Sequence, residues 1–324
     1  MNDNPSPTTG GVPQRPAIRR PVHWENDFSV HALDESPFRN RPSVADEPVG
    51  KFRHWPMHIP QTLMSDADLP GYIARDTFPI PCGADRENYM PDSDIGYWLS
   101  GLGDCLKVMQ AAADQRVSIG SILDLGCASG RVSRHFCIQS RIPEVWGTDV
   151  NRRHIRWLCQ YMPTNMKPCF IPAMPVLPLG DQSVDAVTAF SVFTHIDTFE
   201  TAWLAEIRRV LRPGGMCYLT VHNEDTWRAM RNLDSSNRLV RSMIETGQFR
   251  MEMLDGPLPA DRLVYRFAET GPYRSQVFHS NRYLERTWGR FFDIQDILPG
   301  HHDRQSVVLM TRPPQAVAGA RKAA

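Results

Sequence analysis

The chain has 324 residues, and its 36 Lys and Arg residues balance 36 Asp and Glu residues, so the formal net charge at pH 7 is zero. This balance argues against nucleic acid as an obligate partner, because phosphate binding requires a net basic surface. The seven cysteines form no Cys-x-x-Cys pair, which disfavours a metal site and is typical of reduced thiols. The sequence has no signal-peptide pattern and no apolar run of membrane-spanning length, so we expect a cytoplasmic protein.

The two ends of the chain differ in composition from its middle. Residues 1–50 hold eight of the 27 prolines and show little periodicity, so we expect this segment to be largely disordered. Residues 51–92 mix aromatic residues with prolines, which favours an irregular N-terminal arm without regular structure. Residues 313–324 are expected to form a flexible tail.

Alternating strands and helices are predicted from about residue 93 to residue 312. The first helix is expected to bury a stripe of Trp98, Leu102, Leu106, Met109 and Ala113. The predicted strands lie at 121–125, 144–149, 169–173, 184–193 and 216–222. Helices are predicted between them, from residue 131, around 151–162 and around 200–211.

Such alternation predicts an α/β fold whose mostly parallel sheet is covered by helices on both faces. Asp197 and Glu200 are expected to form a capping box for the last of these helices. The apolar segments 291–298 and 306–312 predict an antiparallel C-terminal hairpin, because only a short loop joins them. Residues 223–290, after the fifth strand, are too long for a simple crossover and are expected to form a cap or substrate-binding insert.

The segment "DLGCASGR", residues 124–131, follows the first strand and opens into a helix. In an open α/β sheet the first such turn is the expected ligand site. The spacing of Asp124, Gly126 and Gly130 is Asp-x-Gly-x-x-x-Gly, which does not match the Gly-x-Gly-x-x-Gly of dinucleotide-binding folds. A carboxylate at the first position suits an ammonium group better than a diphosphate, which favours S-adenosylmethionine over NAD.

Asp149 ends the next strand, where a carboxylate can accept hydrogen bonds from both hydroxyls of a ribose. This feature alone does not separate the two cofactors, because a NAD site uses an acidic residue there too. Asp124 and Asp149 are also plausible helix caps. Their joint position at two strand ends favours the cofactor interpretation.

Four motifs in order, "DLGCASGR", "GTDV", "LPLGDQSVDAVTAFSVFTHI" and "EIRRVLRPGGMCYLTV", resemble class I S-adenosylmethionine-dependent methyltransferases. The resemblance covers residues 95–222 and implies a Rossmann-like, doubly wound sheet of seven strands. It also implies a set of cofactor-binding residues: Asp124, Gly126, Cys127, Ala128, Gly130, Asp149, Val150, Ala173, Met174, Phe190 and Ser191. Two of them depart from the family pattern, since Ala128 replaces a glycine and Ala173 replaces an aspartate. Segments 222–227 and 278–294 further resemble methyltransferases of glycan and surface-polysaccharide assembly.

Methyl transfer to a hydroxyl requires a base, for which histidine is the usual choice. His195 and His222 follow strands that end at the expected cleft and are the candidate catalytic residues, whereas His279 lies in the insert and is a weaker candidate. Tyr265, Arg266, Tyr273 and Arg274 of the insert suit a sugar or a carboxylate-bearing acceptor, although exposed Arg and packed Tyr side chains are the commoner explanation of such residues. The predicted function is O-methylation of a sugar, glycan or small-molecule hydroxyl. Two alternatives stay open: N-methylation of an amino sugar or natural product, and a cofactor-binding scaffold without activity. A nicotinamide dehydrogenase is disfavoured by the glycine spacing.

Overall fold

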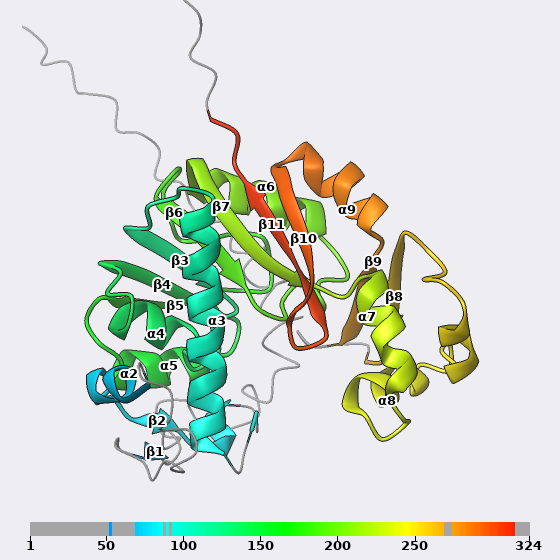
Figure 1. Ribbon diagram of the computed structural model, residues 1–324, viewed down its shortest axis with the longest axis horizontal. Coiled ribbons are helices and arrows are strands. Elements are labelled where there is room, and N and C mark those ends of the chain that lie inside the picture. The colour runs from blue at the N-terminus through cyan, green and yellow to red at the C-terminus, as the bar shows by residue number, and fades with distance from the viewer. Residues whose placement is uncertain (1–51, 54–68, 87–88, 91–92, 269–273, 315–324) are drawn as a thin grey trace, which may run out of the picture.

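The computed structural model describes residues 52–53, 69–86, 89–90, 93–268 and 274–314 (Figure 1). The predicted disordered segment 1–50, the last ten residues of the predicted tail and Tyr273 lie outside the described residues. Among the described residues, no helix is long and apolar enough to cross a membrane.

A seven-stranded sheet forms the centre of the protein, with strand order β10-β11-β7-β6-β3-β4-β5. Its strands are β3 (Ser121–Leu125), β4 (Glu144–Asp149), β5 (Met166–Phe170), β6 (Val184–Ala189), β7 (Leu211–Val221), β10 (Asp293–His302) and β11 (Gln305–Thr311). Strands β3 to β7 are parallel, while β11 pairs antiparallel with both β7 and β10. The predicted fold class is confirmed, although β5 begins three residues earlier than expected and β6 ends at Ala189 rather than at residue 193.

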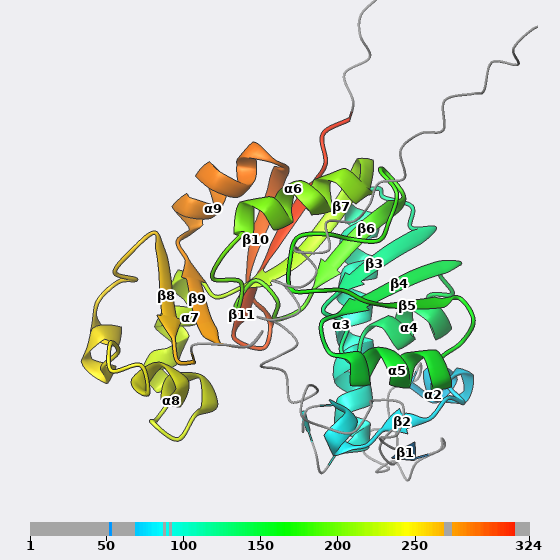
Figure 2. The same ribbon diagram turned by 180° about the vertical axis from the view of Figure 1, so that it is seen from behind.

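Helices cover both faces of this sheet. The helices α3 (Asp94–Asp114), α4 (Ser133–Ile138) and α5 (Arg152–Tyr161) cover one face, and α6 (Glu200–Val210) and α9 (Asn281–Thr287) the other. Figure 1 shows α3 in front of the sheet, and Figure 2 shows α6 and α9 from the opposite side. Alternate residues of β7 serve the two faces, since Met216 and Tyr218 pack with α3 while Cys217 and Leu219 pack with α6.

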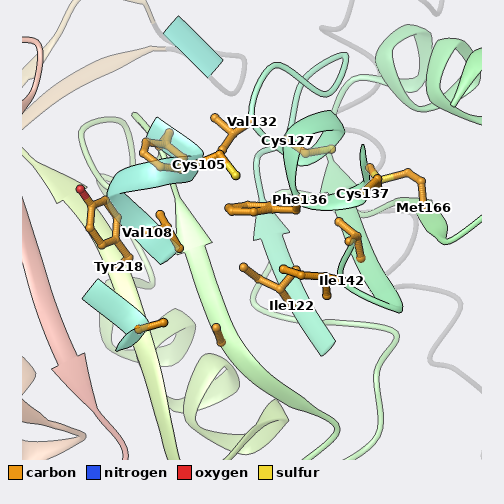
Figure 3. Close-up of a cluster of buried hydrophobic side chains, with 14 of the residues drawn as sticks. Cys105, Val108, Ile122, Cys127, Val132, Phe136, Cys137, Ile142, Met166 and Tyr218 are labelled. Atoms are coloured by element: carbon orange, nitrogen blue, oxygen red, sulfur yellow. The ribbon is translucent and has the colours of Figure 1, made fainter. Parts of the chain in front are cut away.

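Phe136 of α4 lies at the centre of the first face, beside Ile122 of β3 and Cys137 (Figure 3). The buried stripe of α3 differs from the predicted one. Trp98 and Leu102 are buried as predicted, but Leu106 is 41 % exposed, and Cys105 and Val108 continue the buried face in its place. A 3.6-residue period reaches position 105 from 102 and 108 from 105, so the strict four-residue step to Leu106 left the buried face.

The predicted capping box of α6 is wrong. The residue before the helix is Phe199, which has a left-handed backbone and no side-chain capping bond. Asp197 accepts hydrogen bonds from Arg266, Arg274 and Ser275, and Glu200 accepts them from Arg262, His279 and Trp288. Both carboxylates therefore bind partners from the chain after residue 260, which local sequence spacing does not reveal.

The segment after β7 has its own apolar core, which includes Trp227, Met243, Phe249, Tyr265 and Phe278. Its elements are α7 (Glu224–Ala229), η4 (Met230–Asn232), α8 (Arg238–Ile244), η5 (Met251–Asp255), β8 (Arg262–Arg266) and β9 (Ser275–His279). The chain then continues through α9 and η6 (Trp288–Arg290) into β10. Figure 1 shows α7, α8, β8 and β9 gathered at one side of the central sheet.

The arm before α3 contains α2 (Leu69–Arg75), the short strands β1 (Phe52–Arg53) and β2 (Ile80–Pro81), and the turn η3 (Gly83–Arg86). The expectation that it lacks regular structure is therefore wrong for residues 69–75. A buried ion pair attaches this arm to the domain, because the carboxylate of Asp76 accepts from Arg134 at 2.8 and 2.9 Å and from the indole of Trp98 at 2.6 Å. Asp76 and Arg134 are both fully buried.

Candidate active site

A cavity of about 690 Å³ lies at the carboxyl ends of β3, β4, β6 and β7. Eleven predicted site residues line it: Asp124, Gly126, Cys127, Ala128, Asp149, Val150, Ala173, Phe190, Ser191, His195 and His222. Gly130 and Met174 do not line it. A Cβ on Gly130 would lie 2.7 Å from Leu158 of α5, so this glycine is required for helix packing.

The turn after β3 is fixed by its backbone. The amides of Gly126 and Cys127 both donate to the carbonyl of Thr148 on β4, at 2.7 and 3.0 Å. Gly126 has a φ of +71°, and a Cβ there would collide with Val192. Ala128 also has a left-handed backbone, with φ +48°, and its amide donates to Asp149 at 2.8 Å.

Two buried carboxylates line this part of the cavity. Asp149 is 2 % exposed and accepts from the amides of Ala128 and Asn151. Asp124 is also 2 % exposed and accepts from the hydroxyls of Ser133 and Thr188. Burial raises the pKa of Asp124 to about 6, against the opposing effect of the two hydroxyls. A cation bound in the cavity would lower this pKa and so favour the ionised form of Asp124.

Phe190 and Ser191 directly follow β6 and line the cavity. The ring of Phe190 lies 5.1 Å from that of His302, and the guanidinium of Arg131 lies 5.6 Å from its centroid. Arg131 and His302 are both held by Asp104 of α3, at 2.6 and 3.0 Å. Ser191 accepts from the side-chain amide of Gln305 at 2.8 Å.

His195 lies on the cavity wall after β6, where a contact to the insert helps to orient its ring. Its Nδ1 lies 2.8 Å from the carbonyl oxygen of Ser275 on β9. A carbonyl only accepts hydrogen bonds, so Nδ1 carries the proton of the neutral ring and Nε2 is the basic nitrogen. Burial lowers the pKa of His195, and the charge of Arg238 adds to this effect while the Ser275 carbonyl opposes it. The ring is therefore neutral at pH 7.

His222 is more deeply buried, with 6 % of its surface exposed, and it stacks on Phe278 at 5.0 Å. Burial lowers its pKa to about 3. Burial thus lowers the pKa of both candidate bases, and it is the main cause in each case.

The other predicted residues of the insert lie away from the cavity. His279 is fully buried and bonded to Glu200 at 2.9 Å, Arg266 and Arg274 both pair with Asp197, and Tyr265 packs in the core of the insert. Tyr265 is thus packed, as the commoner interpretation of such residues has it, and none of these four residues lines the cavity.

Several cavity residues were missed. They are Arg86 and Tyr89 of the arm, Thr194 after β6, Arg238, Arg241 and Ser242 of α8, Gln276 of β9 and residues 302–305 of the last hairpin. For the residues of α8 and β9, the length of the segment after β7 predicted an insert but not which of its faces meets the cavity.

Comparison with known proteins identifies the central part of the chain. The model of the family described as "Methyltransferase domain" matches residues 123–219, from β3 to β7. The protein is an S-adenosylmethionine-dependent methyltransferase. The matched segment contains the turn, Asp149 and the strand ends that line the cavity, and it is a class I methyltransferase domain.

Several solved structures are similar to this chain in fold, at low sequence identity. One is an S-adenosylmethionine-dependent methyltransferase from Clostridium acetobutylicum, with 12% identity, a TM-score of 0.45 and coverage of 69% of this chain and 94% of that one. Another is the Burkholderia thailandensis 1,6-didemethyltoxoflavin-N1-methyltransferase, with 12% identity, a TM-score of 0.45 and coverage of 81% and 95%. A methyltransferase from Methanosarcina mazei shows 19% identity, a TM-score of 0.41 and coverage of 60% and 93%. A search of curated protein sequences gives no match.

The residues of this methyltransferase fit its cofactor, S-adenosylmethionine. The turn at Gly126 has no side chain over the cavity, Asp124 offers a carboxyl to an ammonium group, and the carboxylate of Asp149 lies at the end of β4. Among the described residues no group of three or more metal-ligating side chains is found.

Proposed function

We propose that the methyltransferase acts on a hydroxyl of a sugar, glycan or other small molecule, with His195 as general base. The observation that carries this proposal is the 2.8 Å contact between His195 Nδ1 and the Ser275 carbonyl, which makes Nε2 the basic nitrogen of a ring lining the cavity. A nitrogen acceptor that is already neutral needs no such base, so the fixed tautomer favours oxygen.

The cofactor site is proposed from the same cavity. Gly126 to Ala128 and Asp124 are assigned to the methionine end, Asp149 to the ribose hydroxyls, and Ala173 and Phe190 to the adenine. S-adenosylmethionine supplies a methyl carbon that is electrophilic because it is bound to a positively charged sulfur. The remaining contribution of the protein is to orient the acceptor in line with that carbon and to exclude water.

In the proposed reaction the acceptor oxygen forms a bond to the methyl carbon while the carbon–sulfur bond breaks. His195 Nε2 takes the hydroxyl proton and becomes an imidazolium, which the Ser275 carbonyl stabilises through Nδ1. The products are the methyl ether, S-adenosylhomocysteine and a proton that later leaves to solvent. His222, with its pKa of about 3, is assigned to positioning rather than to proton transfer.

Replacement of His195 tests this proposal. The protein is incubated with S-adenosylmethionine and a panel of sugars, hydroxy acids and phenols, and methylated products are detected by mass. His195→Ala should lower turnover by about 10²–10⁴-fold, the usual contribution of a positioned base, and leave the affinity for S-adenosylhomocysteine unchanged. The wild-type rate should rise with pH through a pKa below 6.5 and stay level above it, because the base works as the neutral ring.

His222→Ala is the matched comparison, and we expect it to retain more turnover than His195→Ala. Full turnover in both variants on an accepted substrate would contradict general-base catalysis and would favour a nitrogen acceptor. No methylated product from any oxygen acceptor, with products from amines, would refute O-methylation itself.

A further inference from the structure

Three buried polar atoms in one part of the cavity have no hydrogen-bond partner among the described residues. They are the hydroxyl of Thr194, Nδ1 of His222 and Oε1 of Gln276. Their residues are 0 %, 6 % and 8 % exposed, and all three line the cavity. Buried polar atoms are nearly always paired, because an unpaired one loses its hydration without replacement. What distinguishes these three atoms is that their residues all line the cavity, which makes them candidates to bind a polar group of a ligand.

Main-chain bonds bring these residues together. The amide of Val277 donates to the carbonyl of Thr194 at 2.9 Å, and the amide of His279 donates to the carbonyl of His222 at 2.8 Å. Strand β9 thus lies between the chain ends that follow β6 and β7, with Gln276 next to Val277. The Nε2 of Gln276 donates to Ser242 of α8 at 3.3 Å, so its carbonyl oxygen is the atom that accepts, from the neighbouring His222, whose pKa Gln276 raises against burial, or from a donor of the ligand.

A positive charge borders the same region. Arg238 lines the cavity from α8 and forms no ion pair with any described residue. Its charge reaches His195, whose pKa it helps to lower. Arg241, one turn further along α8, lies 3.9 Å from Glu245. The apolar side chains of Ile196, Leu239 and Phe267 line the cavity between these polar groups.

We propose that the methyl acceptor is a small hydroxylated organic anion, whose hydroxyl binds Gln276 and Thr194 and whose anionic group binds Arg238. This inference rests on the proposed function and narrows its substrate class. A hydroxyl both donates and accepts, so it can satisfy the Gln276 carbonyl and the Thr194 hydroxyl together. Arg238 then supplies the charge-assisted contact that holds the other end of the molecule.

Calorimetry with four aromatic probes tests the two contacts separately. The full chain is saturated with S-adenosylhomocysteine, and then 3-hydroxybenzoate, 3-hydroxybenzamide, benzoate and benzamide are titrated. We expect 3-hydroxybenzoate to bind about tenfold or more tightly than either 3-hydroxybenzamide or benzoate, since each comparison removes one polar contact. In Arg238→Gln the preference for the carboxylate should disappear while the preference for the hydroxyl remains. In Gln276→Leu the reverse should hold.

Arg228→Gln is the control for charge, because Arg228 is 68 % exposed on α7 and pairs with Asp225 outside the cavity. Thermal unfolding and affinity for S-adenosylhomocysteine establish that each variant is folded with an intact cofactor site. Any of three results would overturn the inference. The first is equal affinity for 3-hydroxybenzoate and 3-hydroxybenzamide, the second is no binding of either of these probes, and the third is an unchanged preference for the carboxylate in Arg238→Gln. Those results would leave the His195 proposal standing, because they do not measure proton transfer.

Discussion

Ala128 occupies a backbone conformation that usually selects glycine. Its φ of +48° lies in the left-handed region, where a Cβ crowds the following carbonyl oxygen. The residue is nevertheless placed to donate its amide to Asp149, so the turn keeps its geometry and bears the strain. Strain of this kind is found at functional sites, where the surrounding contacts hold the backbone in place.

We predict that Ala128→Gly stabilises the protein. Removing the Cβ relieves about 1 kcal/mol of left-handed strain, part of which is offset by the greater entropy of glycine in the unfolded chain. The matched control is Ala113→Gly on the exposed face of α3, which should lose about 1 kcal/mol. Urea unfolding of both variants measures the difference, and a loss of stability in Ala128→Gly would show that the turn is not strained.

Asp124 is predicted to release a proton when the cofactor binds. Its pKa of about 6 means that about half of the free protein carries a proton there at pH 6, and the ammonium of the cofactor should lower that pKa. Affinity should therefore rise between about pH 5 and pH 7 and level off above. Calorimetry in two buffers of different ionisation enthalpy counts the protons released.

The control for this effect is Asp124→Asn, which should bind more weakly and release no proton at pH 6. Proton release of the same size in the variant would assign the titration to another group. Affinity that is independent of pH in the wild type would remove Asp124 from the ammonium site.

At the scale of elements, the loop between β6 and α6 and the hairpin β8–β9 are joined by two carboxylates. Asp197 pairs with Arg266 and Arg274, and Glu200 binds both Arg262 and His279. His195 lies in this loop, and its partner Ser275 begins β9. The two ion-pair groups therefore set the position of the proposed base relative to the insert.

Glu200→Gln should destabilise the protein at pH 7 by about 3 kcal/mol. Although burial raises its pKa, the bonds from His279 and Trp288 and the charge of Arg262 outweigh burial and lower that pKa from 4.5 to about 2. A carboxyl with a depressed pKa contributes stability above its unfolded pKa of 4.5, and this contribution is lost as pH falls toward 2. The difference between wild type and variant should thus shrink to about 1 kcal/mol at pH 3.

Urea unfolding at pH 7 and at pH 3 measures this change, with Glu245→Gln as the control because that side chain is 61 % exposed. A difference that does not depend on pH would mean that the carboxylate charge of Glu200 does not stabilise the fold.

The elements show what the sequence could and could not predict. Strand β4 was predicted to the residue, and helix α6 was predicted around 200–211 because an amphipathic pattern is local. The turn after β3, which lines the cavity, was predicted because a motif marks it. Asp197 and Glu200 were misassigned because their partners come from beyond residue 260. Gln276 and Arg238 were missed because an insert without a motif gives no sign of which side chains reach the cavity.

At the scale of the whole molecule, the N-terminal arm contributes to the cavity through Arg86 and Tyr89. It is attached at several places. Asp76 pairs with Arg134, the Ser129 hydroxyl donates to the carbonyl of Asp85, and the Asp85 carboxylate accepts from Arg153 at 2.6 Å. Ser129 belongs to the cofactor turn itself, so the arm and the turn hold each other in place.

Asp76→Ala should therefore weaken both the fold and the cofactor site. Arg134 would be left fully buried without its carboxylate, which costs about 3–5 kcal/mol. Affinity for S-adenosylhomocysteine should fall, and trypsin should cut within residues 69–90 faster than in the wild type. Arg75→Ala is the control, since its exposed guanidinium bonds to Gln139 and lies over the ring of Tyr72 and should change stability by about 1 kcal/mol or less. Loss of stability with unchanged cleavage of the arm would contradict this account.

Strand β9 is bonded to the carbonyls of Thr194 and His222, whereas helix α8 is not. These two parts of the insert should therefore tolerate mutation very differently. A substitution that shifts β9 moves the Ser275 carbonyl and, with it, His195 and His222. Such a variant could bind a new acceptor, but its proposed base would be out of place and its turnover would fall. Helix α8 lines the same cavity with exposed residues such as Arg238 and Arg241, and its side chains can change without displacing the base. Directed evolution toward new acceptors should therefore collect its successful substitutions in α8 and leave β9 as it is.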